Sequence, residues 1–151
     1  MTNNSLPNEG RILALDLGRR RIGLALSDEL RLTAQGLETF QRTNMREDLD
    51  GLARIVDERF VTLILLGNPI HMSGNEGAQS GWVRHFASKL QARTGCEIRF
   101  WDERLTTAEA ERVLRASGIS RQKRSKAVDR LAAVILLQSY LESVDAEDEL
   151  E

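Results

Sequence analysis

The order of apolar segments along this chain predicts an α/β fold with a mixed sheet and helices packed on its faces. Two strand patterns come first, over residues 11–17 and 22–27, and the turn-forming segment between them suggests a hairpin. Strand and helix patterns then alternate through the rest of the sequence. A run of neighbouring strands followed by such alternation implies a mixed sheet that is covered by helices.

The first half of the chain supplies three strand patterns and one helix pattern. Residues 11–17 form a nearly continuous apolar run, as in a strand buried on both faces. A third strand is expected from Leu32 to Phe40, although Gly36 weakens it. Residues 45–59 are expected to be helical, because apolar side chains recur there at helical spacing, namely Leu49, Leu52, Ala53 and Val56.

The second half alternates between strands and helices. Residues 61–66, with the sequence VTLILL, are typical of a buried strand, and a short strand is expected at 97–101. A helix is expected at about 78–94. A second helix should begin at the capping box Thr106–Glu109 and end near Gly118, and a third is expected at about 123–143. The last of these is apolar nearly all round over residues 131–137, so it should be deeply buried.

Length and composition predict one folded domain. The chain has 151 residues, of which 41% are hydrophobic and 29% are charged, as in globular proteins with a real core. We expect a flexible leader over residues 1–10, the domain over 11–143 and a disordered acidic tail over 144–151. No segment approaches the roughly 20 apolar residues that span a bilayer, and no signal peptide is visible. The single cysteine, Cys96, favours the reducing cytoplasm and should be a small side chain near the start of a strand.

The charge is distributed unevenly. The segment 145–151 carries five acids and no base, so the rest of the chain has 21 basic and 18 acidic residues, a net charge of +3. Residues 117–130 are especially basic, with Arg121, Lys123, Arg124, Lys126 and Arg130 against Asp129 alone. Such a patch suits a polyanionic partner, and the alternative is an ordinary solvated loop.

Three carboxylates lie next to apolar segments, where burial of a charged side chain costs free energy. Asp16 interrupts the first apolar strand, Glu103 follows Asp102 just after another strand, and Asp129 lies at the edge of the most apolar helix. If they converged, a divalent cation with a preference for oxygen ligands, Mg²⁺ or Mn²⁺, would neutralise their repulsion. Each has an alternative role: Asp16 could cap a turn, and the other two could form salt bridges with nearby bases. Spacing alone does not show that the three meet.

The remaining motifs indicate neither a zinc site nor a phosphate-binding loop. His71 and His85 have no further ligand at zinc spacing, and the glycines at 67, 74 and 77 match no phosphate-binding loop. The aromatic residues Trp82, Phe86 and Trp101 are expected in or at the edge of the core, with stacking on a base as the less favoured role.

Four blocks of the sequence together resemble the YqgF/RuvX family. They are ALDLGRRRIGLALSD at 14–28, LLGNPIHMSGNEG at 65–77, WDERLTTAEAERVL at 101–114 and KAVDRLAAVILLQSYLE at 126–142. Members of this family are described as Holliday junction resolvases and as nucleases that process precursor 16S ribosomal RNA. The sequence departs from the usual pattern of the family at Asn68, where an apolar residue usually precedes the proline, and at His71 in the same loop.

The resemblance implies a ribonuclease H-like fold: a five-stranded mixed sheet flanked by helices, with the first three strands antiparallel. It implies that Asp16, Glu103 and Asp129 form one site, holding Mg²⁺ or Mn²⁺ for phosphodiester hydrolysis. Phosphate contacts would come from basic residues, namely Arg19, Arg20, Lys123, Arg124 and Lys126.

The substrate expected from the resemblance is structured RNA, with branched DNA as the alternative and no membrane partner. A resolvase of branched DNA should act as a symmetric dimer, and the sequence is compatible with a monomer or a homodimer. The segment Asp16–Gly18 also resembles the first phosphate loop of actin-like ATPases, which need two such domains, more than 151 residues supply. A catalytically silent nucleic-acid-binding module is the third alternative, which the presence of all three acids does not favour.

Overall fold

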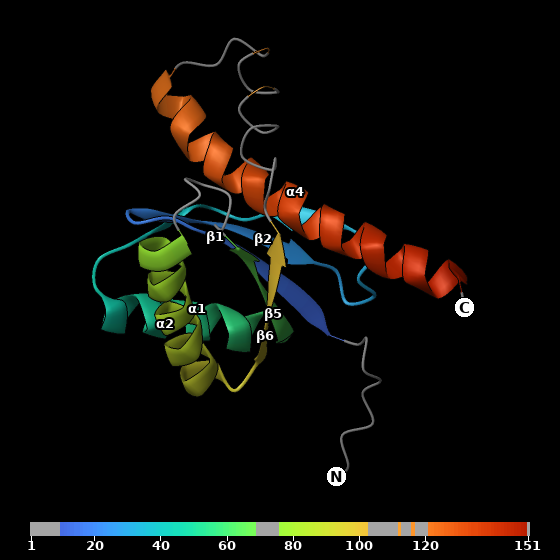
Figure 1. The fold of residues 1–151 in the computed structure, drawn as a ribbon, viewed down its shortest axis with the longest axis horizontal. Coiled ribbons are helices and arrows are strands. Elements are labelled where there is room, and N and C mark those ends of the chain that lie inside the picture. The colour runs from blue at the N-terminus through green and yellow to red at the C-terminus, as the bar shows by residue number, and fades with distance from the viewer. Residues whose placement is uncertain (1–9, 69–75, 103–111, 113–115, 117–120, 151) are drawn as a thin grey trace.

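A single mixed sheet with helices on both faces forms the framework of the protein (Figure 1). The computed structural model describes residues 10–68, 76–102, 112, 116 and 121–150. The strands are β1 (Arg11–Leu17), β2 (Arg21–Ser27), β3 (Ala34–Gly36), β4 (Phe40–Gln41), β5 (Val61–Asn68) and β6 (Glu97–Asp102). The helices in the described part of the chain are α1 (Met45–Glu58), α2 (Glu76–Thr94) and α4 (Arg121–Leu150).

The strand order is β3-β2-β1-β5-β6, and the short β4 also pairs with β2. Strand β2 runs antiparallel to both β1 and β3, whereas β1, β5 and β6 run parallel to one another. This confirms the predicted mixed sheet, including its antiparallel first three strands.

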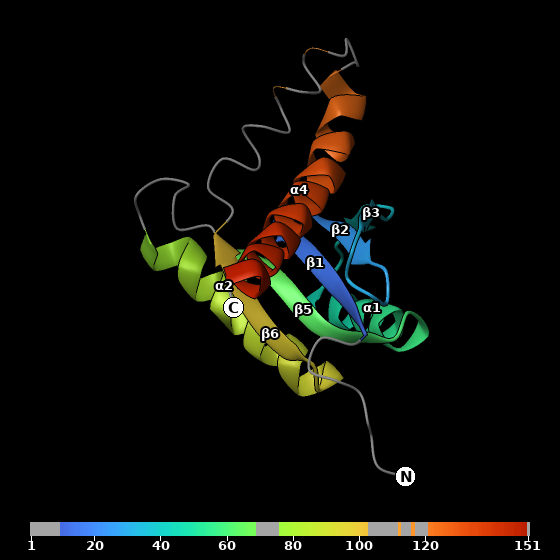
Figure 2. The ribbon, with the colours of Figure 1, turned by 90° about the vertical axis from the view of Figure 1, so that its right-hand side faces the viewer.

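Two apolar layers hold the helices to the sheet. Helix α4 crosses one face, and α1 and α2 cover the other (Figure 2). Because strand side chains alternate between faces, Ile12 and Ala14 pack toward α4, whereas Leu13 and Leu15 pack toward α1 and α2. The four apolar positions predicted to form the buried stripe of α1 are all buried, namely Leu49, Leu52, Ala53 and Val56.

The predicted third strand, Leu32 to Phe40, is wrong in extent. The structure has two short strands there, Ala34–Gly36 and Phe40–Gln41. The cause is Asp28, whose Oδ1 accepts the backbone N–H groups of Leu32 at 2.8 Å and Thr33 at 2.7 Å. These bonds fold the segment into a turn and leave the Leu32 side chain 67% exposed.

Replacing Asp28 with alanine should lower the free energy of unfolding at neutral pH by about 1 kcal/mol. Partial burial disfavours the charged carboxylate, but the hydrogen bonds from Thr33 and Leu32 outweigh it and lower the pKa of Asp28. A lowered pKa stabilises the fold above the ordinary value of about 4, and this contribution is lost as the pH falls through the folded-state pKa. Urea unfolding from about pH 7 to about pH 2 should therefore show a shallower acid destabilisation in the variant. Equal slopes would contradict the role assigned to Asp28.

Helix α4 is longer than predicted. It continues to Leu150, beyond the expected end near Ser143 and into the segment expected to be a disordered tail. The reason is that residues 144–150 contain no glycine or proline to stop the helix, whereas alanine, glutamate and leucine favour it.

Neither α4 nor another helix in the described part of the chain is long and apolar enough to cross a membrane. The helix predicted from residue 106 to near 118 lies outside the described residues, apart from the helical positions 112 and 116.

Cys96 is a buried, free cysteine directly before β6, as predicted. Its thiol lies 3.4 Å from the carbonyl oxygen of Val61, to which it donates. Burial raises the pKa of this thiol, so it remains neutral at physiological pH and packs as a small apolar group.

Candidate active site

The carboxyl ends of the three parallel strands meet at one edge of the sheet. Leu15 on β1 pairs with Leu66 on β5, which in turn pairs with Phe100 on β6. One residue further along each strand, Asp16, Gly67 and Trp101 therefore lie at the same level. In sheets of this kind, ligands bind beyond the carboxyl ends of the strands.

Asp16 belongs to the face of the sheet that α4 covers. It follows Ile12 and Ala14 at alternate positions of β1, and both of those residues are fully buried against α4. Asp16 itself is half-buried, and its backbone is paired with Gly23 of β2. The strand therefore holds this carboxylate at a fixed position beside the edge of the apolar layer.

The end of β6 is tied to the same helix. The Trp101 indole N–H donates to Ser139 Oγ of α4 at 3.1 Å, and the ring meets Tyr140 edge-on with centroids 5.2 Å apart. Asp102 is the last residue of β6, but its side chain is not among those described. Glu103, the second predicted ligand, lies outside the described residues and follows Trp101 by two positions in the sequence.

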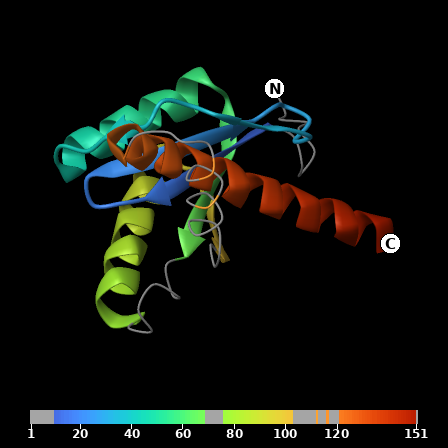
Figure 3. The same cartoon turned by 90° about the horizontal axis from the view of Figure 1, so that it is seen from above.

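Asp129 lies in the first half of α4, and only its backbone is described. Position 129 is four residues before Ala133, which is fully buried against the sheet, so both positions fall on one side of the helix. The next residue, Arg130, lines a small cavity with Arg21 and Gln41, beside the β1–β2 turn. The structure therefore brings the elements that carry Asp16 and Asp129 together (Figure 3). Among the described residues, no group of three acidic, histidine or cysteine side chains could hold a metal, and the side chains of Glu103 and Asp129 are not among those described.

A close approach of α4 to β3 depends on Gly36. A Cβ atom at this position would lie 2.7 Å from Cγ of Arg130 and 3.3 Å from Cγ2 of Val134. The glycine that weakens the predicted third strand thus allows the first half of α4 to lie directly on the sheet.

The β1–β2 turn carries two of the predicted phosphate-binding residues. Arg19 and Arg20 are exposed, and the turn is closed by a 3.0 Å hydrogen bond from Gly18 N–H to the Arg21 carbonyl. Only glycine fits at position 18, because a Cβ atom would lie 2.7 Å from that same carbonyl oxygen. The other three predicted residues, Lys123, Arg124 and Lys126, lie in the first turns of α4, and their side chains are not described.

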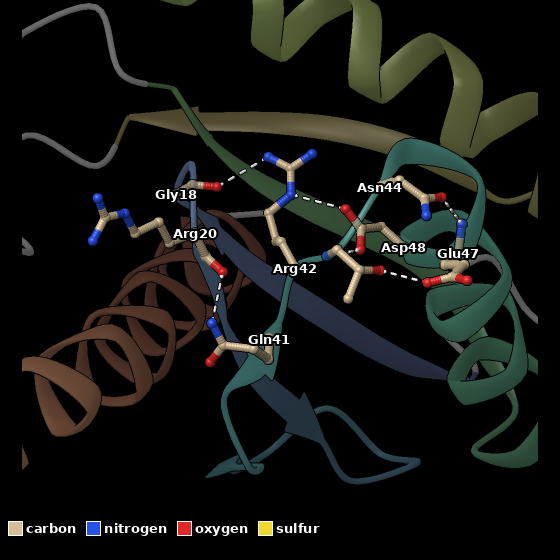
Figure 4. A network of polar contacts seen from close by, with 8 residues as sticks. Gly18, Arg20, Gln41, Arg42, Asn44, Glu47 and Asp48 are labelled. Atoms are coloured by element: carbon tan, nitrogen blue, oxygen red, sulfur yellow. Dashed lines mark hydrogen bonds and ion pairs between the residues drawn. The ribbon is translucent and has the colours of Figure 1, made fainter.

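A buried ion pair supports this turn from the α1 side, and sequence analysis missed it (Figure 4). Arg42 Nε lies 3.0 Å from Asp48 Oδ2, and the Asp48 side chain is only 1% exposed. The other guanidinium arm donates from Nη1 to the Gly18 carbonyl at 3.1 Å. A signal was present in the sequence, because Asp48 lies four residues before the buried Leu52 on the apolar stripe of α1.

Hydrogen bonds at the start of α1 fix the acid of this pair. Asp48 Oδ1 accepts the Thr43 N–H at 2.9 Å, and the Asn44 side chain caps the helix by accepting the Glu47 N–H at 2.9 Å. Arg42 thus connects the start of α1 to Gly18, which lies two residues after Asp16 and begins the β1–β2 turn.

Comparison with known proteins gives one consistent family. The sequence profile described as "RuvX: Holliday junction resolvase" matches residues 10–143. A protein of Koribacter versatilis named "Putative pre-16S rRNA nuclease" is 47% identical over 143 residues, covering 93% of this chain and 94% of that protein. A protein of the same name from Carboxydothermus hydrogenoformans is 47% identical over 131 residues, covering 87% of this chain and 95% of that protein.

Two solved structures are similar in fold. RuvC of T. thermophilus in complex with a Holliday junction substrate aligns with a TM-score of 0.56 and 16% identity, covering 89% of this chain and 95% of that one. The Fowlpox virus resolvase bound to Holliday junction DNA aligns with a TM-score of 0.57 and 14% identity, covering 89% and 98%. At such low identity the similarity concerns the fold alone, and it confirms the predicted ribonuclease H-like architecture.

Proposed function

Because the chain belongs to the RuvX family, we propose that it is a divalent-metal-dependent nuclease that processes the precursor of 16S ribosomal RNA in the cytoplasm. The observation that carries this proposal is the position of Asp16. It is a half-buried carboxylate at the carboxyl edge of the sheet, on the α4 face, directly before a turn with two exposed arginines. Proteins that are 47% identical to the chain carry the name of that activity.

Asp16, Glu103 and Asp129 would hold the metal. Their oxygen-only donor set is typical of Mg²⁺ or Mn²⁺ sites, whereas zinc and copper sites are usually built from histidine and cysteine. When bound, such ions lower the pKa of a water molecule and neutralise the charge that develops on the leaving oxygen. The contribution of β1 is rigidity, because a carboxylate on a paired central strand needs little reorganisation to bind a cation.

Arg19 and Arg20 would bind the phosphates of the substrate. Both are exposed on the turn that follows Asp16, so they could contact the backbone next to the bond that is cleaved. Lys123, Arg124 and Lys126 would extend this surface along the first turns of α4. Contacts of this kind position the nucleic acid without reading its sequence, and they weaken with added salt.

The second candidate function is resolution of branched DNA, which the description of the matching family favours. A resolvase must place two active sites across a two-fold axis and cut two strands at symmetric points. A processing nuclease cuts a single strand and needs no such symmetry.

Offering both substrates to the purified protein tests the proposal. A radiolabelled precursor of 16S ribosomal RNA and a four-way DNA junction would each be incubated with Mg²⁺, with Mn²⁺ or with EDTA. We expect metal-dependent cleavage of the RNA at defined positions and little cleavage of the junction. Paired symmetric cuts in the junction with intact RNA would favour the resolvase, and cleavage in EDTA would contradict metal dependence.

A further inference from the structure

A cavity of about 750 Å³ lies beside the β1–β2 turn, toward α1 and α2 rather than α4. Three segments form its wall: the end of β1 with the turn, the segment that leads from β4 into α1, and α2. The lining residues that matter here are Leu17, Arg19, Arg20, Arg42, Met45 and Trp82. The cavity and Asp16 thus lie on opposite faces of the sheet, at the same end of β1.

Trp82 contributes an aromatic ring to the wall of the cavity. It is half-buried on α2, and the guanidinium carbon of Arg42 lies 4.9 Å from the centroid of its ring. The same guanidinium carbon lies 5.2 Å from the centroid of the Phe86 ring, and the Trp82 and Phe86 centroids are 6.5 Å apart. Because Asp48 and the Gly18 carbonyl hold Arg42, the ring and the cation above it form a preorganised stack.

The charge at the cavity is positive. Asp48 is the only carboxylate among the described lining residues, and Arg42 neutralises it. Arg19 and Arg20 remain as exposed cations at the rim, and the Arg20 side chain points away from Arg42 (Figure 4). An aromatic ring in the wall with cations at the rim is complementary to a base that carries phosphates on both sides.

We propose that this cavity binds an unpaired nucleobase of the RNA strand beside the Arg42–Trp82 stack and in contact with Trp82, while Arg19 and Arg20 contact the flanking phosphates. This inference rests on the proposed function and specifies its substrate: RNA that is single-stranded next to the cleaved bond. A strand that crosses the turn would present a phosphate on the Asp16 side and a base on the Trp82 side. A fully paired duplex would bind poorly, because its bases are stacked on one another and unavailable.

A base-deletion experiment separates stacking from phosphate binding. Full-length Asp16→Asn protein in EDTA would be titrated with a short single-stranded RNA and with the same RNA carrying abasic sites, and binding would be followed by fluorescence anisotropy. We expect loss of the bases to weaken binding to this protein about tenfold. Adding Trp82→Ala should make the two RNAs bind equally, whereas adding Arg19→Ala should weaken both by the same factor.

Tryptophan fluorescence locates the base independently. The chain has two tryptophans, so Trp101→Phe leaves Trp82 as the only indole and Trp82→Phe leaves Trp101. Single-stranded RNA should quench the first variant and leave the second nearly unchanged. His85→Ala, at an exposed position on the same helix, is the matched control and should bind like the parent.

The outcomes distinguish the two proposals. If folded Trp82→Ala protein still discriminates intact from abasic RNA tenfold, or if RNA quenches Trp101 instead of Trp82, the base-binding cavity is wrong. Neither result bears on metal-dependent cleavage by the unmodified protein. Conversely, coupling between Trp82 and the base without any metal-dependent cleavage would overturn the proposed nuclease and leave the cavity as a nucleotide-binding site. Far-UV circular dichroism and melting temperature identify variants that fail to fold, and Trp82→Phe, which retains a ring, should keep most of the affinity.

Discussion

The Asp16→Asn protein is expected to cleave RNA at least about a thousandfold more slowly than the parent, a loss of roughly 4 kcal/mol of transition-state stabilisation. The substitution preserves the shape of the side chain and removes the negative charge that a divalent ion requires. Glu103→Gln and Asp129→Asn should have the same effect if the three acids form one site. Single-turnover cleavage at saturating protein measures the chemical step directly.

Binding and folding serve as controls for this result. Affinity for uncleaved RNA in EDTA should change little, because the phosphate contacts come from other residues. Asp57→Asn removes a carboxylate from an exposed position on α1 and should leave cleavage unchanged. If Asp16→Asn protein with an unchanged melting temperature cleaved within tenfold of the parent rate, Asp16 would not be a metal ligand.

Asp48→Ala is expected to lower the free energy of unfolding by about 3–5 kcal/mol, the usual cost of leaving one buried charge without its partner. The acid is 1% exposed, and its loss would also leave the Thr43 N–H without its acceptor. Urea denaturation gives the change in stability. Since Arg42 links Asp48 to the Gly18 carbonyl, cleavage activity should fall as well.

The chain offers a matched control for that prediction. Asp50, also on α1, forms an ion pair with Arg93 at 3.0 Å, but both side chains are about half exposed, at 47% and 51%. Asp50→Ala should therefore cost less than about 1 kcal/mol. Combining Asp48→Ala with Arg42→Leu should recover part of the lost stability, because no isolated charge remains buried. If Asp48→Ala and Asp50→Ala lowered the free energy of unfolding equally, burial of the Arg42–Asp48 pair would not add to the cost of breaking it.

Local patterns in the sequence were sufficient for most of the fold. Strand β1 was predicted with its exact bounds and helix α1 within one residue, because apolar periodicity directly records which faces are buried. The third strand failed because its length depends on Asp28, a side chain outside the segment that accepts its backbone N–H groups. Periodicity contains no information about such bonds.

The candidate site was only partly accessible to sequence reasoning. Asp16 stands out because an acid inside an apolar strand is costly, and the same reasoning applied to the stripe of α1 would have found Asp48. Whether Asp16, Glu103 and Asp129 meet could not be derived in this way. Contacts between residues so far apart in the chain depend on strand order and helix crossing, which no local pattern specifies. Resemblance supplied that grouping, and it stays a prediction.

Helix α4 has an electrical consequence that follows from its course across the sheet. Its first turns contain four basic residues, Arg121, Lys123, Arg124 and Lys126, and lie toward the β1–β2 turn. Its last turns contain four acidic residues, Asp145, Glu147, Asp148 and Glu149, and extend past the opposite end of the sheet (Figure 3). The helix therefore carries basic residues at its start and acidic residues at its end. A polyanion approaching from solution is attracted to one end and repelled by the other, so the protein is oriented, with the carboxyl edge foremost, before contact is made.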